Sequence, residues 1–406
     1  MTSKFLIAAA SVSLLYSASA MAADAPKGGP KLTHGIAVAL TDAQKAIGTK
    51  DWPTALAAID KAKAVSGPTP YDTLMINRFA MGIHGGMGDM VAADADAEAA
   101  ADVDPSAIPD ADKASVYKPA LQLAVNAKHP DKAVKYAKLF LATTPPPSSA
   151  DQALATMAIY QGGDYATATS IAQKNIDAAT AAGQKPAISD LQIIMNSQVK
   201  QNDQAGAEKT LEALVANYGQ PQDWNQIMAV ALTTKGMRDI DYIYMGRLMF
   251  LQGGTVTPTD ASLVGSTSSR LGFLGDAVEA QKHGATGFPP ADAKADADKK
   301  TIPAQIAAGP KQNGLYNVKL AQALYGYGMY PEAIASAELG KSKGGDPDAT
   351  EADMVIAMAQ AASGQYAASV TTFSGIQAPN PAAARVVRLW GYFAKSKASP
   401  ATAAAK

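Results

Sequence analysis

Residues 320–339 read LAQALYGYGMYPEAIASAEL, and this stretch decides the fold. Tyr330 follows a glycine turn, and small residues stand three, seven and ten positions later, at Ala333, Ala337 and Gly340. These offsets place small side chains on one face of a helix, where a neighbouring helix can approach closely. The stretch therefore predicts a pair of helices joined by a glycine turn.

A looser form of this pattern, with small or apolar residues at the same offsets, occurs nine times along the chain of 406 residues, although Pro130, Gln204 and Arg238 replace the aromatic residue. One position, which we call the anchor, opens the second helix of each predicted pair. The anchors are Trp52, Met90, Pro130, Tyr165, Gln204, Arg238, Leu274, Tyr330 and Tyr366, at intervals of 34 to 40 residues with one exception of 56. A nearly constant period of this length predicts one continuous solenoid, in which each pair packs on its neighbours.

Two further features keep the same phase. A glycine stands two residues before the anchor in six copies, where it suits a left-handed residue that closes the first helix. A proline stands fifteen residues after the anchor in three copies, at Pro105, Pro145 and Pro381, where it would open the next unit. The predicted unit is a helix, a glycine turn, a second helix and a break.

These runs resemble the tetratricopeptide repeat, most closely at residues 328–333, 163–168 and 364–369. The resemblance covers most of residues 35–395 and implies an all-α fold. Its architecture would be a right-handed α-solenoid of about nine helix pairs that ends in a capping helix. The last three units are also similar to exported repeat proteins of proteobacteria. Because Asp241 stands where a small residue belongs, we expect a degenerate unit at residues 222–252.

The long interval between anchors predicts an inserted segment at residues 285–314, with a short exposed helix in its alanine-rich and charged part. Loops are expected at residues 143–149 and 253–269, and a disordered tail at residues 396–406.

A final helix is expected at residues 381–397. Its apolar side would carry Val386, Leu389, Trp390 and Phe393, which predicts a cap over the open end of the array. A basic amphipathic helix lying on an anionic membrane is the alternative.

Residues 1–22 predict a signal peptide, with Lys4 before an apolar stretch and small residues at its end. We expect cleavage between Ala22 and Ala23, followed by a linker over residues 23–34; a buried first helix is the alternative. The apolar stretch is too short to span a bilayer, so no integral membrane segment is expected after cleavage. The chain has no cysteine, and export without disulfides suits a bacterial periplasm.

The sequence offers little for catalysis, metals or nucleic acid. Its 35 basic and 36 acidic residues nearly balance, which disfavours nucleic acid as a partner. The histidines, His34, His84, His129 and His283, lack ligand spacing, and His84 is expected to pack between helices. Neither a zinc-protease motif nor a nucleophile elbow occurs, and residues 340–342 lack the earlier glycine of a phosphate loop. The acidic run at residues 89–104 lacks calcium-loop spacing, and we expect a solvated face. We expect no enzyme, metal or cofactor.

The resemblance implies that the first helices of the pairs line a concave groove. The positions that would face it are Met75, Arg78, Lys118, Gln122, Met157, Tyr160, Gln192, Asn196, Gln226, Gln322, Tyr325, Met354 and Met358. This lining is neutral and rich in amides, tyrosine and methionine, which favours an extended polypeptide as the guest. The clustered basic residues that would hold an acidic C-terminal tail are missing.

We therefore expect a non-enzymatic periplasmic scaffold or adaptor that binds a protein or extended peptide of the cell envelope. The alternative is a glycan-binding or glycan-processing accessory protein, because Tyr160, Tyr325 and Tyr327 could stack on sugars. A lytic enzyme built on a helical superstructure is disfavoured, because the chain has no room for a separate catalytic domain.

Overall fold

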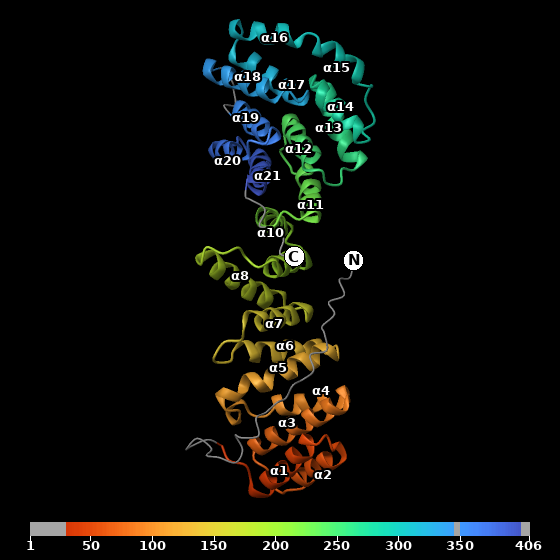
Figure 1. Ribbon diagram of the computed structural model, residues 1–406, viewed down its shortest axis with the longest axis vertical. Coiled ribbons are helices and arrows are strands. Elements are labelled where there is room, and N and C mark those ends of the chain that lie inside the picture. The colour runs from red at the N-terminus through yellow and green to blue at the C-terminus, as the bar shows by residue number, and fades with distance from the viewer. Residues whose placement is uncertain (1–29, 345–349, 399–406) are drawn as a thin grey trace. The chain divides into compact units, whose positions relative to one another are not determined.

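The computed structural model describes residues 30–344 and 350–398, and Figure 1 shows its helices. Every regular element in these residues is a helix, so the all-α prediction is confirmed. The predicted leader, most of the linker and the end of the tail lie outside the described residues. The chain divides into two compact units at Asn202 and Asp203, where the sequence predicts one continuous array. No helix in the described ranges is both long enough and apolar enough to cross a membrane.

The N-terminal unit consists of helices that pack in chain order, each on the next. They are α1 (His34–Gly48), α2 (Trp52–Lys63), α3 (Pro70–Met87), α4 (Met90–Ala101), the short η2 (Pro105–Ala107), α5 (Asp110–Asn126), α6 (Pro130–Leu141), α7 (Ser149–Gln161), α8 (Tyr165–Ala181) and α9 (Ile188–Lys200). First helices of neighbouring pairs also touch, as α1 touches α3 and α7 touches α9. This is the stacking that a helix-pair repeat requires.

Asp72, in the first turn of α3, fixes the beginning of the N-terminal unit. Its carboxylate accepts hydrogen bonds from the backbone N–H and hydroxyl of Thr33, at 2.9 and 2.7 Å, and from the same two groups of Thr69, at 2.9 and 2.8 Å. Burial by itself would raise the pKa of Asp72, but these hydrogen bonds outweigh burial and lower it. Thr33, inside the predicted linker, therefore already belongs to the folded unit.

The acidic run of α4 is only partly a solvated face, because it pairs with bases on neighbouring helices. Nζ of Lys135 on α6 lies 2.7 Å from Oδ1 of Asp102. Nδ1 of His84 on α3 lies 2.6 Å from Oδ2 of Asp96, which confirms the predicted interhelical histidine. Asp94 is buried and lies 3.1 Å from His129. These contacts join one helix to the next without forming a ligand site.

The C-terminal unit contains the remaining helices, the insertion and the last helix. They are α10 (Gln204–Asn217), α11 (Pro221–Leu232), α12 (Asp239–Gln252), α13 (Pro258–Leu271), α14 (Leu274–Lys282), α15 (Asp292–Lys299), α16 (Ile302–Ala308), η3 (Gly309–Lys311), α17 (Gly314–Gly326), α18 (Tyr330–Lys343), α19 (Thr350–Ala362), α20 (Tyr366–Gly375) and α21 (Pro381–Ala398). Eight predicted pairs lie whole within one unit, whereas α9 and α10 stand on either side of the division. The predicted short helix of the insertion is α15.

Helix α13 corrects the prediction of a loop at residues 253–269. The Thr257 hydroxyl accepts a hydrogen bond from the backbone N–H of Asp260 at 3.1 Å, and Pro258 occupies the first turn. Ala261 and Val264 are buried. A serine- and threonine-rich segment has modest helix propensity, but its cap and its burial stabilise the helix here. The repeat requires a first helix before each anchor, so position within the repeat predicted this segment better than its composition did.

Each anchor stands where a second helix begins, and the residue two positions before it is left-handed every time. Arg238 is the cap residue of its helix, and the other anchors are first helical residues. The predicted glycines, Gly88, Gly163, Gly236, Gly272, Gly328 and Gly364, have φ between 75° and 89°. The copies without glycine use Lys50, Lys128 and Asn202, at φ of 57°, 59° and 58°. The left-handed residue therefore belongs to the position in the repeat, whichever amino acid occupies it.

We expect Lys128→Gly to stabilise the N-terminal unit by about 1 kcal/mol, because a side chain in the left-handed region is strained and glycine is not. Gly163→Ala is the matched control with the opposite sign. An added Cβ there would meet no atom within 4 Å, so backbone strain alone should destabilise the unit by about 1 kcal/mol. Urea unfolding of both variants measures the two changes. If both variants changed the free energy of unfolding in the same direction, the turn position would not be a left-handed site that favours glycine.

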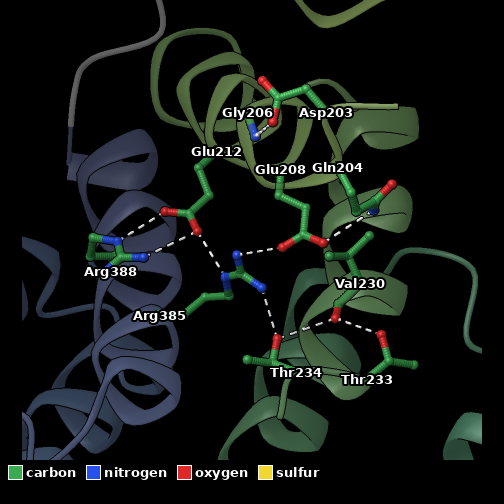
Figure 2. A network of polar contacts seen from close by, with 10 residues as sticks. All are labelled: Asp203, Gln204, Gly206, Glu208, Glu212, Val230, Thr233, Thr234, Arg385 and Arg388. Carbon is green, nitrogen blue, oxygen red and sulfur yellow. Dashed lines mark hydrogen bonds and ion pairs between the residues drawn. The ribbon is translucent and has the colours of Figure 1, made fainter. Parts of the chain in front are cut away.

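Helix α21 fastens the end of the C-terminal unit to its beginning, as Figure 2 shows. Arg385 donates from Nη2 to Glu208 at 2.8 Å, from Nε to Glu212 at 2.9 Å, and from Nη1 to the Thr234 hydroxyl at 2.7 Å. Arg388 adds a hydrogen bond from Nε to Glu212 at 2.9 Å. The cationic side of α21 thus binds α10 and the end of α11.

The apolar side of α21 is buried, which confirms the predicted capping helix. Val386, Leu389, Trp390 and Phe393 are at most 3% exposed. Helices α12, α19 and α20 lie in contact with α21. This side is therefore covered by protein, and the alternative of a helix lying on a membrane does not fit. Helix α21 also continues to Ala398, into the predicted disordered tail.

Candidate functional site

The first helices of the N-terminal unit keep most of the predicted groove residues accessible. Gln192 and Asn196 on α9 are exposed. Half-buried side chains are Lys118 and Gln122 on α5 and Met157 and Tyr160 on α7. Met75 and Arg78 on α3 are the exceptions, because each is 8% exposed.

The two basic residues of this predicted lining are neutralised by the next helix pair. Arg78 donates to the Ser115 hydroxyl at 3.1 Å, and its Nη1 lies 3.7 Å from Oδ1 of Asp112 on α5. Nζ of Lys118 lies 2.8 Å from Oδ1 of Asp151 on α7. These pairs link successive first helices. They leave a surface of nearly balanced charge, with little to attract an acidic tail.

In the C-terminal unit, Gln322, Tyr325, Met354 and Met358 are all buried, so these four do not form an accessible lining. Helix α12 of the same unit lies on that side of α17. Nε2 of Gln322 donates to the Tyr244 hydroxyl at 2.7 Å, and Nη2 of Arg247 donates to the backbone carbonyl of Gln322 at 2.6 Å.

The same helix also reaches α19 through its cap residue. Nη1 of Arg238 lies 3.9 Å from Oε1 of Glu351 on α19. Gln226 on α11, the remaining predicted groove residue of this unit, is exposed.

Helix α12 takes this place because it is apolar on several sides. Its buried residues include Ile240, Ile243, Met245, Leu248 and Met249. A helix that is hydrophobic all round has to be enclosed by other elements. The degenerate unit at 222–252 departs from the repeat pattern for this reason, and the density of large apolar residues at 240–251 was the signal for it.

A buried ion pair fixes α12 to α14. Nε and Nη2 of Arg247 each lie 2.8 Å from one carboxylate oxygen of Asp276, and the two side chains are 2% and 5% exposed. The guanidinium lies 4.3 Å from the centre of the Tyr325 ring. Burial alone would lower the pKa of Arg247, but the Asp276 charge and hydrogen bonds outweigh it and raise the pKa. Arg247 therefore remains a cation.

Two glycines allow α14 and α17 to approach closely enough for this pair. A Cβ added to Gly275 would lie 2.4 Å from the Gly326 carbonyl oxygen. A Cβ added to Gly326 would lie 2.5 Å from Oδ2 of Asp276. Both contacts are too short for real atoms, so side chains here would separate the helices and displace the carboxylate.

A cavity of about 380 Å³ lies beside the ion pair. Its walls come from α12, α14, α15 and the turn between α17 and α18, which contributes Tyr325, Tyr327 and Tyr330. The Tyr327 hydroxyl donates to Oδ2 of Asp298 on α15 at 2.7 Å, so the insertion forms one wall. The cavity thus joins a buried cation, three phenols and an added helix.

The cavity wall carries both signs of charge. Its acids are Asp276, Glu279, Asp292 and Asp296, and its bases are Arg247, Lys282 and Lys299. Burial raises the pKa of each of the three tyrosines, so the phenols stay protonated and can donate hydrogen bonds at neutral pH. Nowhere in the described residues do three or more histidine or acidic side chains gather as metal ligands would.

Sequence reasoning found only part of this cavity. Tyr325 and Tyr327, two of the tyrosines proposed to stack on sugars, meet in it. Tyr160 belongs to the N-terminal unit, where its ring packs 5.6 Å from that of Tyr165. Arg247 and Asp276 were missed, because no local pattern announces a pair that forms between two helices.

Comparison with known proteins adds little to this geometry. No protein-family model matches the chain, and no curated protein matches it significantly. Among solved structures, that of Naa15/Naa10 bound to HypK-THB is 12% identical, with 85% of this chain and 69% of that chain covered, at a TM-score of 0.20. The crystal structure of yeast Tom70 is 9% identical, with 89% and 96% covered, at a TM-score of 0.23. The fold assignment therefore rests on the helix pairs themselves.

Proposed function

We propose that this chain is a non-enzymatic scaffold or adaptor that binds an extended segment of another protein on the first helices of its N-terminal unit. The observation that carries the proposal is the contrast between the two units. The lining of α5, α7 and α9 stays accessible, whereas the corresponding residues of α17 and α19 are buried.

The chemistry of the accessible lining favours a neutral, extended polypeptide. Gln122, Gln192 and Asn196 carry amides, which can both donate to and accept from a peptide backbone. Met157 can adapt to varied apolar side chains, and Tyr160 combines an apolar ring with a hydroxyl. Because Lys118 is already paired with Asp151, attraction to a charged tail contributes little.

We further propose that the protein works in the bacterial periplasm, where its partner would be another protein of the cell envelope. The leader-like residues 1–22 and the absence of cysteine from the sequence support this location.

A photo-crosslinking residue placed at Gln192 tests both parts of the proposal. In the native cell it should trap one or a few envelope proteins, identified by mass spectrometry, and the same spectra should show a mature N-terminus at Ala23. The matched control is Lys174, which is exposed on the second helix α8 of the same unit. Trapping of the same proteins from Lys174, or of glycan fragments alone from Gln192, would overturn the scaffold function. A retained Met1 would overturn the location.

A further inference from the structure

We propose that the cavity beside the Arg247–Asp276 ion pair binds a neutral carbohydrate unit. The site lies within the C-terminal unit and shares no residue with the accessible lining of α5, α7 and α9. It goes beyond the scaffold function, and neither depends on the other.

The charges on the cavity wall disfavour both anionic and cationic ligands. Four carboxylates and three cationic side chains stand on the cavity wall, so neither sign of charge is in large excess. Asp276 is paired with Arg247, and Oε2 of Glu279 lies 2.9 Å from Nζ of Lys282. Arg247 also lies over the ring of Tyr325 at 4.3 Å, and Lys299 lies over that of Tyr327 at 5.4 Å, so a cationic ligand would find those ring faces occupied. What remains is a ligand without net charge.

Hydrogen-bonding capacity selects a polyol among neutral ligands. Ionised carboxylates only accept hydrogen bonds, and ammonium and guanidinium groups only donate them. A hydroxyl does both, so a molecule with several adjacent hydroxyls can satisfy both kinds of wall group at once. A single amide group also donates and accepts hydrogen bonds, but it does not offer several such groups on adjacent atoms. The mixture on the wall, with Asp296 and Lys299 one helical turn apart on α15, therefore fits a sugar ring.

Unpartnered donors show that the protein leaves bonds open here. The hydroxyls of Tyr325 and Tyr330 belong to residues that line the cavity, and they make no hydrogen bond within residues 30–344 and 350–398. Nη1 of Arg247 also has no partner in the described part of the chain, but that atom is fully buried. The two phenols are therefore the donors that a ligand with oxygen atoms could satisfy.

The size and the aromatic walls agree with this ligand class. A volume of about 380 Å³ is within the range of small-molecule sites. Tyr330 is half-buried, and its ring offers apolar surface to the C–H side of a sugar. This ligand class also explains why the insertion is present. Ala295 is the only buried residue of α15, so this helix adds little to the core but supplies a polar wall of the cavity.

The test is binding of a defined sugar panel to the full protein, measured by saturation-transfer NMR and calorimetry. The panel contains glucose, galactose, N-acetylglucosamine and the β-1,4 disaccharides of glucose and of N-acetylglucosamine, with glucuronate and glucosamine as charged comparators. At least one neutral sugar should bind, and more tightly than either comparator. Tyr330→Phe and Asp296→Ala should each weaken it about tenfold, the loss of one good hydrogen bond.

Tyr366→Phe is the matched control, because Tyr366 opens α20 as Tyr330 opens α18 but lies outside the cavity. It should leave sugar binding unchanged. The proposal is overturned if no neutral sugar binds, if a charged comparator binds better, or if Tyr330→Phe and Asp296→Ala bind as the unchanged protein does. Crosslinking from Gln192 proceeds in any of these cases, so failure here is distinguishable from failure of the scaffold function.

Discussion

Replacing Trp390 by alanine is expected to lower the free energy of unfolding of the C-terminal unit by about 4 kcal/mol, the usual range for a large buried aromatic. Trp390 of α21 is 0% exposed. Its ring centre lies 6.0 Å from that of Phe373 and 6.1 Å from that of Phe393. Its Nε1 donates to the backbone carbonyl of Tyr244 at 2.9 Å. The substitution would leave a cavity and a buried carbonyl without its donor.

Urea unfolding followed by circular dichroism measures the change for Trp390→Ala. Hydrogen exchange read by mass spectrometry assigns it to residues beyond 203. Trp390→Phe is the control, because it keeps an aromatic ring in the core but loses the N–H and part of the indole, so its effect should be smaller, about 2 kcal/mol. If alanine and phenylalanine destabilise the unit equally, packing of this ring is not what holds α21 in place.

Asp276→Ala should destabilise the same unit by about 3–5 kcal/mol, as expected when one member of a buried ion pair is removed. The Arg247 guanidinium would remain in the interior without its compensating charge, while its bond to the Gln322 carbonyl persists. Urea unfolding at neutral pH again measures the change. Most of the loss should come from the stranded charge rather than from the missing attraction.

The double variant Arg247→Met with Asp276→Ala separates those two contributions. Because it removes both charges together, it should recover at least half of the stability lost in Asp276→Ala. If the double variant is less stable than Asp276→Ala alone, the stranded Arg247 charge is not what destabilises the single variant, and the expected recovery of stability is wrong.

The repeat architecture could be predicted because it is written in local spacing. The anchors mark the starts of second helices, and the glycines before them predicted left-handed residues that the structure confirms. Lys50 and Lys128 take the same conformation without any such signal in their identity, and Asn202 takes it with only the weaker preference of asparagine. In those copies the position within the repeat predicts the left-handed backbone conformation better than the amino-acid type does, because the turn between paired helices imposes it.

The candidate sites could be predicted only in part, because spacing shows which side of a helix faces its neighbours but not what occupies that side. Gln192 and Gln322 both hold groove positions, yet one is exposed and the other buried. Helix α12, which is distant from α17 in the sequence, packs over Gln322, and no such helix in the described residues covers Gln192. The bond between Tyr244 and Gln322 spans 78 residues, and no local period encodes such a contact.

The contact between α21 and α10 also determines when each unit can be finished. Arg385 and Glu208 are 177 residues apart in the chain, whereas the N-terminal unit is built from contacts between successive helices. Contacts between distant residues slow folding, and these cannot form before residues 381–398 have left the ribosome. The N-terminal unit can thus assemble helix by helix during synthesis. Its C-terminal counterpart must wait, incomplete and with apolar surface uncovered, until α21 has emerged.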